Sequence, residues 1–255
     1  MMLHDTTWFY PAVYLWMAIG CITMIFVFRI RAPYGRHVRP GWGPVIPARL
    51  GWIMMESPAL FGVLGFYFIS DYRDDPARMV FIALWVTHYG YRTLIYPFRA
   101  RISARPMPLA IAAMAIGFNG VNATLLGVGL FILPLDFGPA WFATPQFWLG
   151  LGLFVSGYTI NHRADAILFA LRAPGETGYK IPRGSLYRWV SCPNYLGEIV
   201  EWVGFAVLTW SLPGACFALW TIANLAPRAR DHHRWYVDKF DDYPPERKAL
   251  IPYVF

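Results

Sequence analysis

Polar side chains recur at helical spacing in stretches that are otherwise apolar, and the first group follows the run FWLGLGLFVSGYTI. Asn161, Asp165 and Arg172 stand at i, i+4 and i+11, so a helix would place them on one face. An amide, a carboxylate and a guanidinium in one stripe could bind a polar ligand through charge-assisted hydrogen bonds. The alternative is a solvated helix end that carries an Asp–Arg pair.

A second group combines an amide with two acids in the segment SCPNYLGEIVEWVG. Asn194, Glu198 and Glu201 stand at i, i+4 and i+7, again on one helical face. The segment has no Lys or Arg of its own. Two acids in an apolar helix therefore need partners from other helices, or they take part in proton transfer. Structural pairing alone is the competing explanation.

A third group lies in RARDHHRWY, where Arg228, His232 and Tyr236 are spaced four apart. Metal binding by His232 and His233 is an alternative for this segment. Adjacent histidines on a helix point about 100° apart, so they do not readily share one ion. No metal site is expected.

A fourth group consists of a solitary acid and a tyrosine in neighbouring apolar runs. Glu56 lies in WIMMESPALFG, and in THYGYRTLIYPF the residues Tyr89 and Tyr96 share one face while His88 and Arg92 share another. A buried carboxyl beside a tyrosine could act as an acid couple that donates a proton. An interfacial tyrosine with the acid paired to arginine is the alternative.

Composition indicates where these helices lie. Of the 255 residues 57% are hydrophobic, 18% aromatic and only 15% charged, whereas soluble domains carry about 25% charged residues. The sequence therefore predicts an integral, multi-pass membrane protein in contact with lipid. The net charge of +7 arises from basic residues in short loops, so no nucleic-acid partner is expected. Cys21, Cys192 and Cys216 form no C-x-x-C pair and are expected to be packing residues.

The expected fold is an all-α bundle of about seven transmembrane helices, since a span needs about 20 mostly apolar residues. Expected spans cover residues about 8–28, 50–70, 78–98, 108–133, 146–170, 195–211 and 214–227. Basic loops alternate with loops that are neutral or mixed in charge, which places the N-terminus outside and the C-terminus in the cytoplasm. Sheet is not expected, because open edges cannot face lipid. A single domain, 1–255, is expected, since no linker divides the chain.

Nucleotide-binding and hydrolase motifs are missing from the sequence. There is no G-x-G-x-x-G, no G-x-x-x-x-G-K-[ST] and no G-x-S-x-G. A nucleotide that binds here must therefore be held by side chains between helices.

Several segments closely resemble the C-terminal region of the steroid 5α-reductases, the 3-oxo-5α-steroid 4-dehydrogenases. They are INHRAD, LRAPGETGYKIPRGSLYRWVSCPNYLGEIVEWVGFAVLTWSLP and HHRWYVDKFDDYPPERKALIPYVF, and HYGYRT and ESPAL extend the likeness toward the N-terminus. The resemblance implies a seven-helix membrane bundle that binds NADPH from the cytoplasmic side. It also implies hydride transfer to C5 of a 3-oxo-Δ4 steroid, with a proton added at C4, and an apolar enone substrate that enters from the bilayer.

The resemblance assigns roles residue by residue. The catalytic pair falls on Glu56 and Tyr89, with Tyr89 donating to the C3 carbonyl and Glu56 holding that arrangement. Residues 1–105 would then form mainly the substrate pocket and catalytic pair, and 106–255 mainly the cofactor site. The cofactor-binding pattern falls on Asn161, Asp165, Arg172, Tyr179, Asn194, Arg228, His232 and Tyr236.

Further residues match the family less specifically. One of Arg99, Arg101 and Arg105 is expected to join the cofactor site, with Arg105 as the candidate. The positions expected near the nicotinamide or the sterol are Glu198, Glu201 and Trp202.

Departures from the family pattern are few. Met55 stands where Gln is usual, and Lys180 where Arg is usual.

Alternative functions are reduction of an enoyl or polyprenyl double bond, methyl transfer of the isoprenylcysteine methyltransferase type, and transport by a seven-span transporter. A monomer is the expected state.

Overall fold

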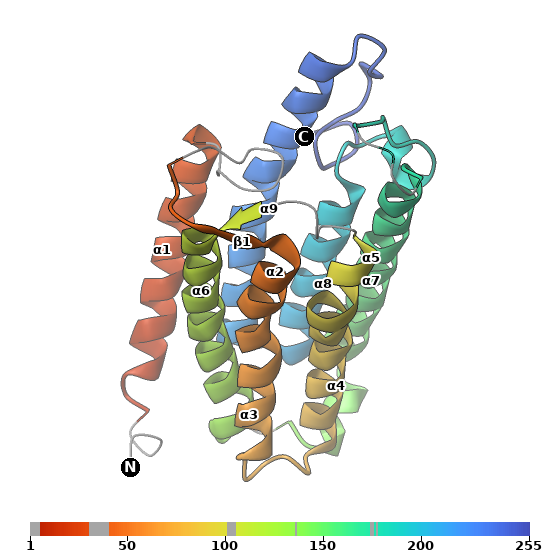
Figure 1. Ribbon diagram of the computed structural model, residues 1–255. Coiled ribbons are helices and arrows are strands. Elements are labelled where there is room, and N and C mark those ends of the chain that lie inside the picture. Colours follow the sequence, from red (N-terminus) through yellow and green to blue (C-terminus); the bar gives the residue numbers. More distant parts are fainter. Residues whose placement is uncertain (1–5, 31–40, 101–105, 136, 174–175, 177) are drawn as a thin grey trace.

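A bundle of long helices makes up the protein (Figure 1). The computed structural model describes residues 6–30, 41–100, 106–135, 137–173, 176 and 178–255. Within them, seven helical rods stand side by side, which confirms the all-α prediction. The rods are α1 (Phe9–Arg29), α2 with α3 (Ala48–Ser57, Val63–Phe68), α4 with α5 (Pro76–Gly90, Tyr96–Arg99), α6 (Leu109–Gly127), α7 (Pro145–Ala170), α8 (Pro193–Thr209) and α9 (Leu212–Lys239).

π-helical turns occur in three of the rods. Pro58–Gly62 joins α2 to α3, Tyr91–Ile95 joins α4 to α5, and Val128–Ile132 ends α6. The first turn begins two residues after Glu56 and the second two residues after Tyr89. Such turns are rare and often lie at functional sites.

A short sheet departs from the purely helical expectation. Strands β1 (Val45–Pro47) and β2 (Pro106–Pro108) pair antiparallel, with Ile46 opposite Met107. Each strand leads directly into a helix, β1 into α2 and β2 into α6. The pair therefore joins the starts of two neighbouring rods. It was missed because three residues with prolines at their ends carry no alternating pattern.

The last helix is longer than predicted. The apolar run ends near 227, but α9 continues to Lys239 and contains Pro227 in its interior. In Figure 1 this extension rises beyond the other rods, next to the C-terminus. The spacing of Arg228, His232 and Tyr236 is therefore helical, although they lie beyond the apolar run.

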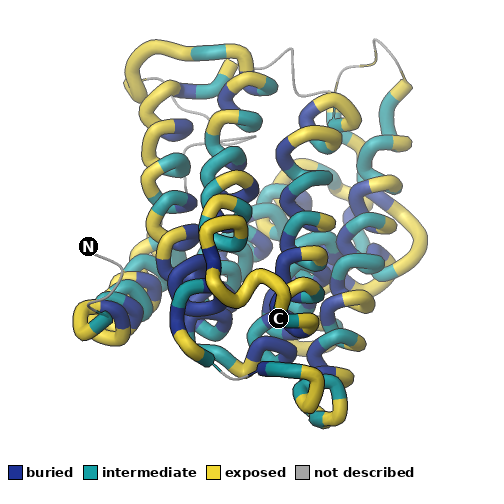
Figure 2. The backbone as a smooth tube through the Cα atoms, turned by 90° about the horizontal axis from the view of Figure 1, so that it is seen from below, coloured by how far each residue is buried: buried dark blue, intermediate teal, exposed yellow. Residues whose placement is uncertain are grey.

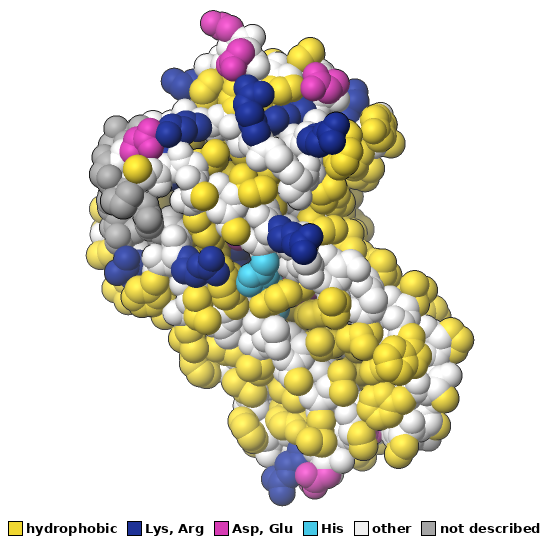
Figure 3. All heavy atoms as spheres, turned by 90° about the vertical axis from the view of Figure 1, so that its right-hand side faces the viewer, with side chains coloured by type: hydrophobic (Ala, Val, Ile, Leu, Met, Phe, Trp, Pro, Cys, Tyr) yellow, Lys and Arg dark blue, Asp and Glu magenta, His cyan; other side chains and the backbone are white. Residues whose placement is uncertain are grey.

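The outer surface is suited to a membrane. Buried positions line the inward faces of the helices and exposed ones the outside (Figure 2). On the face in Figure 3, charged side chains gather in the upper part and at the lower tip, with hydrophobic ones between. Three helices in the described ranges are long and apolar enough to cross a membrane: Phe9–Arg29, Ala48–Phe68 and Leu109–Ile132. Ala48–Phe68 carries Glu56, and other polar residues of the candidate site lie on α4, α7, α8 and α9.

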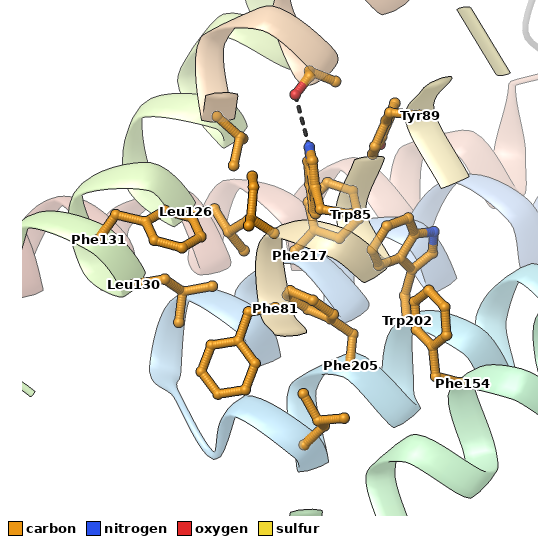
Figure 4. Close-up of a cluster of buried hydrophobic side chains, with 14 of the residues drawn as sticks. Phe81, Trp85, Tyr89, Leu126, Leu130, Phe131, Phe154, Trp202, Phe205 and Phe217 are labelled. Carbon is orange, nitrogen blue, oxygen red and sulfur yellow. Dashed lines mark hydrogen bonds between the residues drawn. The ribbon is translucent and has the colours of Figure 1, made fainter. Parts of the chain in front are cut away.

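Aromatic side chains fill the centre of the bundle (Figure 4). The ring of Trp85 on α4 lies 5.1 Å from that of Trp202 on α8 and 5.1 Å from that of Phe217 on α9. Phe81 and Phe205 continue this cluster toward the end of the bundle at which α4 begins. Large buried rings contribute strongly to core stability, so this cluster fixes α4 against α8 and α9.

Helices α7 and α8 share the most extensive contact in the described bundle. A Cβ on Gly157 would lie 2.2 Å from the backbone nitrogen of Glu201, and one on Gly197 would lie 2.4 Å from that of Asn161. Gly150 and Gly204 repeat this contact further along the pair. Small residues let membrane helices approach backbone to backbone. The polar stripes of α7 and α8 are thereby brought together.

A buried arginine lies at the end of the bundle where α4 begins. Arg78 near the start of α4 donates to the carbonyls of Leu133 at 3.1 Å and Leu135 at 2.6 Å. Asp75 caps α4 by accepting from the backbone N–H of Ala77, 2.8 Å away, and lies 3.9 Å from the Arg78 guanidinium. These contacts hold the segment after α6 against α4.

Candidate active site

Glu56 and Tyr89 are both buried in the bundle, where they form what we term the acid–tyrosine pair. Glu56 is 8% exposed and Tyr89 6% exposed, and the two side chains interact electrostatically. They come from antiparallel helices, α2 and α4, each just before a π-helical turn. The structure thus places the two residues predicted to be catalytic inside the bundle, on neighbouring helices.

Two indole hydrogen bonds bracket the acid–tyrosine pair. The Nε1–H of Trp52, one helical turn before Glu56, donates to the carbonyl of Arg92 at 2.9 Å. The Nε1–H of Trp85, one turn before Tyr89, donates to the carbonyl of Ala59 at 2.8 Å (Figure 4). Because the helices are antiparallel, these bonds fix α2 against α4 on both sides of the pair. Both donors satisfy carbonyls that would be costly to bury alone.

Arg92 places a positive charge beside the acid–tyrosine pair. Its guanidinium carbon lies 4.9 Å from the ring centre of Trp52 and 4.7 Å from that of Tyr96. Such cation–π contacts hold an arginine in a defined place. The aromatic pair Trp52 and Tyr96 is itself packed, with ring centres 4.9 Å apart.

The charge of Arg92 connects the acids of three helices. It interacts electrostatically with Glu198 of α8, Glu56 of α2 and Asp165 of α7. Arg92 is half-buried, and a cation among several acids lowers the cost of holding them in one place. In the sequence Arg92 shares a helical face with His88, but its place among the acids of three helices was not predicted.

The polar stripes of α7 and α8 meet as a hydrogen-bonded cluster. Asn161 Nδ2–H donates to the carbonyl of Asn194 at 2.9 Å and to Glu198 Oε2 at 3.5 Å. Asn194 Nδ2–H donates to Asp165 Oδ1 at 3.1 Å. Both Asn161 and Asp165 are buried. The structure therefore joins these four predicted cofactor and substrate positions into one network.

Glu201 lies apart from that network and reaches α4. Its Oε1 is 2.8 Å from Nδ1 of His88, and both side chains are buried. Trp202, the next residue, packs its ring 5.7 Å from that of Tyr89. Trp202 and Glu201, both predicted to be near the substrate or nicotinamide, thus lie beside the acid–tyrosine pair. The His88 contact was not foreseen.

The predicted cofactor residues of α9 lie in its extension. His232 packs its ring 5.5 Å from Tyr195 of α8. Tyr236 is buried and stacks on Tyr243 with ring centres 5.3 Å apart. Arg228 is half-buried one helical turn before His232. This end of the site is therefore formed by α9 together with the chain that follows it.

The segment between α7 and α8 supplies two further predicted cofactor residues. Arg172 donates to the carbonyl of Gly178 at 3.5 Å, and the ring of Tyr179 lies 4.7 Å from that of Trp235 on α9. Arg99, at the end of α5, donates to the Tyr91 hydroxyl at 3.2 Å.

Arg101 and Arg105 were considered for the cofactor site, and both lie outside the described residues.

No group of three or more His, Cys, Asp or Glu in the described part of the chain could hold a metal ion.

The chemistry of the site is graded along the bundle. The deep part holds a buried acid and a buried tyrosine, and a tyrosine hydroxyl can stabilise negative charge on a substrate oxygen. The outer part holds amides, a carboxylate and arginines, which suit ribose hydroxyls and phosphates. Fold and site together define an α-helical membrane protein with a polar centre inside its bundle.

Comparisons with known proteins agree on one family. The sequence model described as 3-oxo-5-alpha-steroid 4-dehydrogenase matches residues 105–255. Steroid 5-alpha-reductase DET2 from Gossypium hirsutum is 43% identical over 258 residues, covering 100% of both chains. 3-oxo-5-alpha-steroid 4-dehydrogenase 1 from Homo sapiens is 41% identical over 245 residues, covering 95% of this chain and 93% of its own. The chain belongs to the 3-oxo-5-alpha-steroid 4-dehydrogenase family.

Proposed function

We propose that this protein is an integral-membrane oxidoreductase that reduces the C4–C5 double bond of a 3-oxo-Δ4 steroid with NADPH. The product is the 5α-reduced 3-oxosteroid. The names of its relatives support the reaction class. Proteins named as steroid 5-alpha-reductase and 3-oxo-5-alpha-steroid 4-dehydrogenase match 95% or more of the chain. The observation that carries the proposal is the buried acid–tyrosine pair, bracketed by two indole hydrogen bonds.

The pair provides what the enone chemistry requires. Addition of hydride at C5 moves negative charge through the conjugated system onto the C3 oxygen. A donor aimed at that oxygen lowers the barrier, because it acts mainly in the transition state. In this proposal Tyr89 donates its O–H to the C3 oxygen, while Glu56 holds the tyrosine in that orientation. The proton that completes the reduction is added at C4.

The outer part of the site fits a nicotinamide dinucleotide. Asp165, Asn161 and Asn194 offer groups for ribose hydroxyls and amides, and Arg172 and Arg228 offer bidentate donors for phosphates. Tyr179, His232 and Tyr236 add aromatic surface near the same end. When bound, NADPH would supply the hydride. The side chains of this chain bind and orient it and exclude water from the reacting carbons.

The proposed membrane arrangement follows from the charge of the loops. All seven rods cross the bilayer, with the N-terminus outside and the cofactor site open to the cytoplasm. In Figure 1 the C-terminus lies at the same end as the α9 extension. An apolar steroid can then reach the deep site laterally through lipid. Residues 1–105 contribute mainly the substrate pocket and 106–255 mainly the cofactor site, within a monomer.

The test is direct reduction by purified protein in detergent. Protein is incubated with NADPH and a panel of enones that includes a Δ4-3-ketosteroid, enoyl lipids and a polyprenyl substrate. Mass spectrometry should show a gain of two hydrogens on the steroid only. Deuterium from NADPH labelled at the nicotinamide C4 should appear at steroid C5.

Other outcomes would redirect the proposal. Reduction of an enoyl or polyprenyl substrate alone would change the substrate class and keep the reductase. A transporter would instead be identified by two results: no NADPH binding in a fluorescence titration, and movement of a solute across the membrane of vesicles that contain the protein.

A further inference from the structure

The Glu201–His88 hydrogen bond joins the cofactor-side helix α8 to the helix that carries Tyr89. Glu201 is fully buried, and its Oε1 lies 2.8 Å from His88 Nδ1. Its Oε2 has no hydrogen-bond partner within the part of the chain that the structure describes. Among the described residues, the hydrogen bond of this acid thus goes to a residue 113 positions away in the sequence.

The His88 ring packs against two aromatic rings of the site. Its centre is 5.0 Å from the ring of Tyr89 and 4.6 Å from that of Trp202, edge-on to both. The rings of Tyr89 and Trp202 are 5.7 Å apart. A hydrogen bond that fixes the His88 ring therefore fixes a surface against which the tyrosine ring packs.

Glu201 lies where α8 packs most closely on α7, so its position is well fixed. Its backbone nitrogen lies where a Cβ on Gly157 would come within 2.2 Å, so α7 and α8 touch directly at this residue. By contrast, Tyr89 is followed by the π-helical turn Tyr91–Ile95, where the regular backbone hydrogen bonds of the helix change. The tyrosine lies next to an irregular turn, and the acid lies on the most tightly packed helix pair.

We infer that Glu201 and His88 are a positioning pair that holds Tyr89 in its productive orientation. Glu201 acts through His88 and does not contact the substrate itself. This assignment rests on the proposed role of Tyr89 as the donor to the substrate oxygen.

A double-mutant cycle tests the assignment. Glu201→Leu and Glu201→Gln are each measured in the wild-type and in the Tyr89→Phe background, with kcat, NADPH KM and NADPH affinity recorded. Glu201→Leu should lower kcat about tenfold or more in the wild type, but less than about twofold in Tyr89→Phe, because residues that act as a unit are not additive. NADPH affinity should change by less than about threefold. Glu201→Gln keeps a hydrogen bond to His88 and should retain kcat within about threefold.

The control separates positioning from general destabilisation. Thr209→Val removes a buried hydroxyl at the far end of α8, where it bonds the Phe205 carbonyl at 2.9 Å. It should lower thermal stability and leave kcat unchanged. Where Glu201→Leu does not fold, His88→Phe takes its place in the cycle, because it keeps an aromatic ring and loses the hydrogen bond.

Three results would overturn the inference. Equal losses in both backgrounds would show that Glu201 acts independently of Tyr89. A Gln variant as inactive as the Leu variant would show that the carboxyl group itself is required. Near-wild-type kcat in Tyr89→Phe alone would refute the proposed role of the tyrosine, and the positioning role with it. That last failure is visible without any change at Glu201.

Discussion

Trp85 of α4 donates its indole N–H to the carbonyl of Ala59, 2.8 Å away on the π-helical turn that follows Glu56. The donor precedes Tyr89 by one turn, and the acceptor follows Glu56 by three residues. This bond therefore sets how far α4 stands from the acid.

Loss of that bond should weaken both stability and turnover. Trp85→Phe keeps a large ring but leaves the buried Ala59 carbonyl without its donor, which should lower the free energy of unfolding by about 1–3 kcal/mol. The kcat should fall while NADPH affinity is kept. Thermal unfolding in detergent and steady-state kinetics measure the two effects. The matched control is Trp148→Phe, an exposed indole that donates to the Phe142 carbonyl at 2.8 Å and should change little.

Glu56 and Tyr89 should behave as one unit in catalysis. Tyr89→Phe removes one donor to the developing oxyanion and should lower kcat roughly 10²–10³-fold, about 2.7–4 kcal/mol. Glu56→Gln should cost a similar amount, and the double variant little more. NADPH binding should survive in all three. Losses that multiply would mean that the two residues work independently.

Asp165 should matter for the cofactor more than for assembly. It accepts from Asn194 and interacts with the charges of Arg92 and Arg99. Asp165→Asn should weaken NADPH binding about tenfold, measured by fluorescence titration, because a charge-assisted acceptor is lost. Asp238→Asn, at an exposed site of α9, is the matched control. A variant that fails to fold, with normal affinity in any folded fraction, would make Asp165 a structural residue.

Arginines at the outer end should select NADPH over NADH. Arg172→Ala or Arg228→Ala should raise the KM for NADPH at least tenfold, about 1.4 kcal/mol. Arg183→Ala provides the control, since this exposed arginine lies 3.5 Å from Asp242. Its KM should be unchanged. Equal use of NADPH and NADH by the wild-type protein would contradict the expectation.

The extension of α9 and the chain packed on it should lose stability in mild acid. His233, in α9 beyond the predicted span 214–227, lies 2.7 Å from the Ser191 hydroxyl. Burial, and then the charges of Lys248 and Arg234, hold the pKa of His233 below its ordinary value of about 6.5. Below that pH the unfolded chain binds more protons than the folded one, so stability falls as pH falls.

The pH prediction is checked by thermal unfolding at about pH 7.5 and about pH 5.5. The wild-type midpoint should fall more between these values than that of His233→Asn, which cannot take up the proton. The same pH dependence in both proteins would remove His233 as its cause.

The sequence predicted the rods well, because a long, mostly apolar run of residues indicates a long helix whose side chains are buried in protein or lipid. Every expected span corresponds to an observed rod, with ends that agree within a few residues except at α9. That helix continues past Pro227 because the chain after it packs on the extension. Tyr243 of that chain, for example, stacks on Tyr236 of α9. The π-helical turns left no pattern in the sequence, since they depend on packing between helices.

Helical spacing also found most of the candidate site, but not its pairings. The α7 and α8 stripes were visible, since Asn161 and Asp165, like Asn194 and Glu198, recur at i and i+4. That Glu201 would meet His88 depends on the rotation of two helices far apart in the chain. A periodicity along one helix contains no information on that rotation.

The glycine contact between α7 and α8 has a consequence for how substrates get in and out. At Gly157 and Gly197 the two backbones touch, so neither helix can tilt or slide without a steric clash. The pair therefore acts as a fixed wall of the enzyme. We expect the motions that admit a steroid to involve helices outside this pair, such as α1, whose Tyr14, Leu15 and Phe26 are exposed.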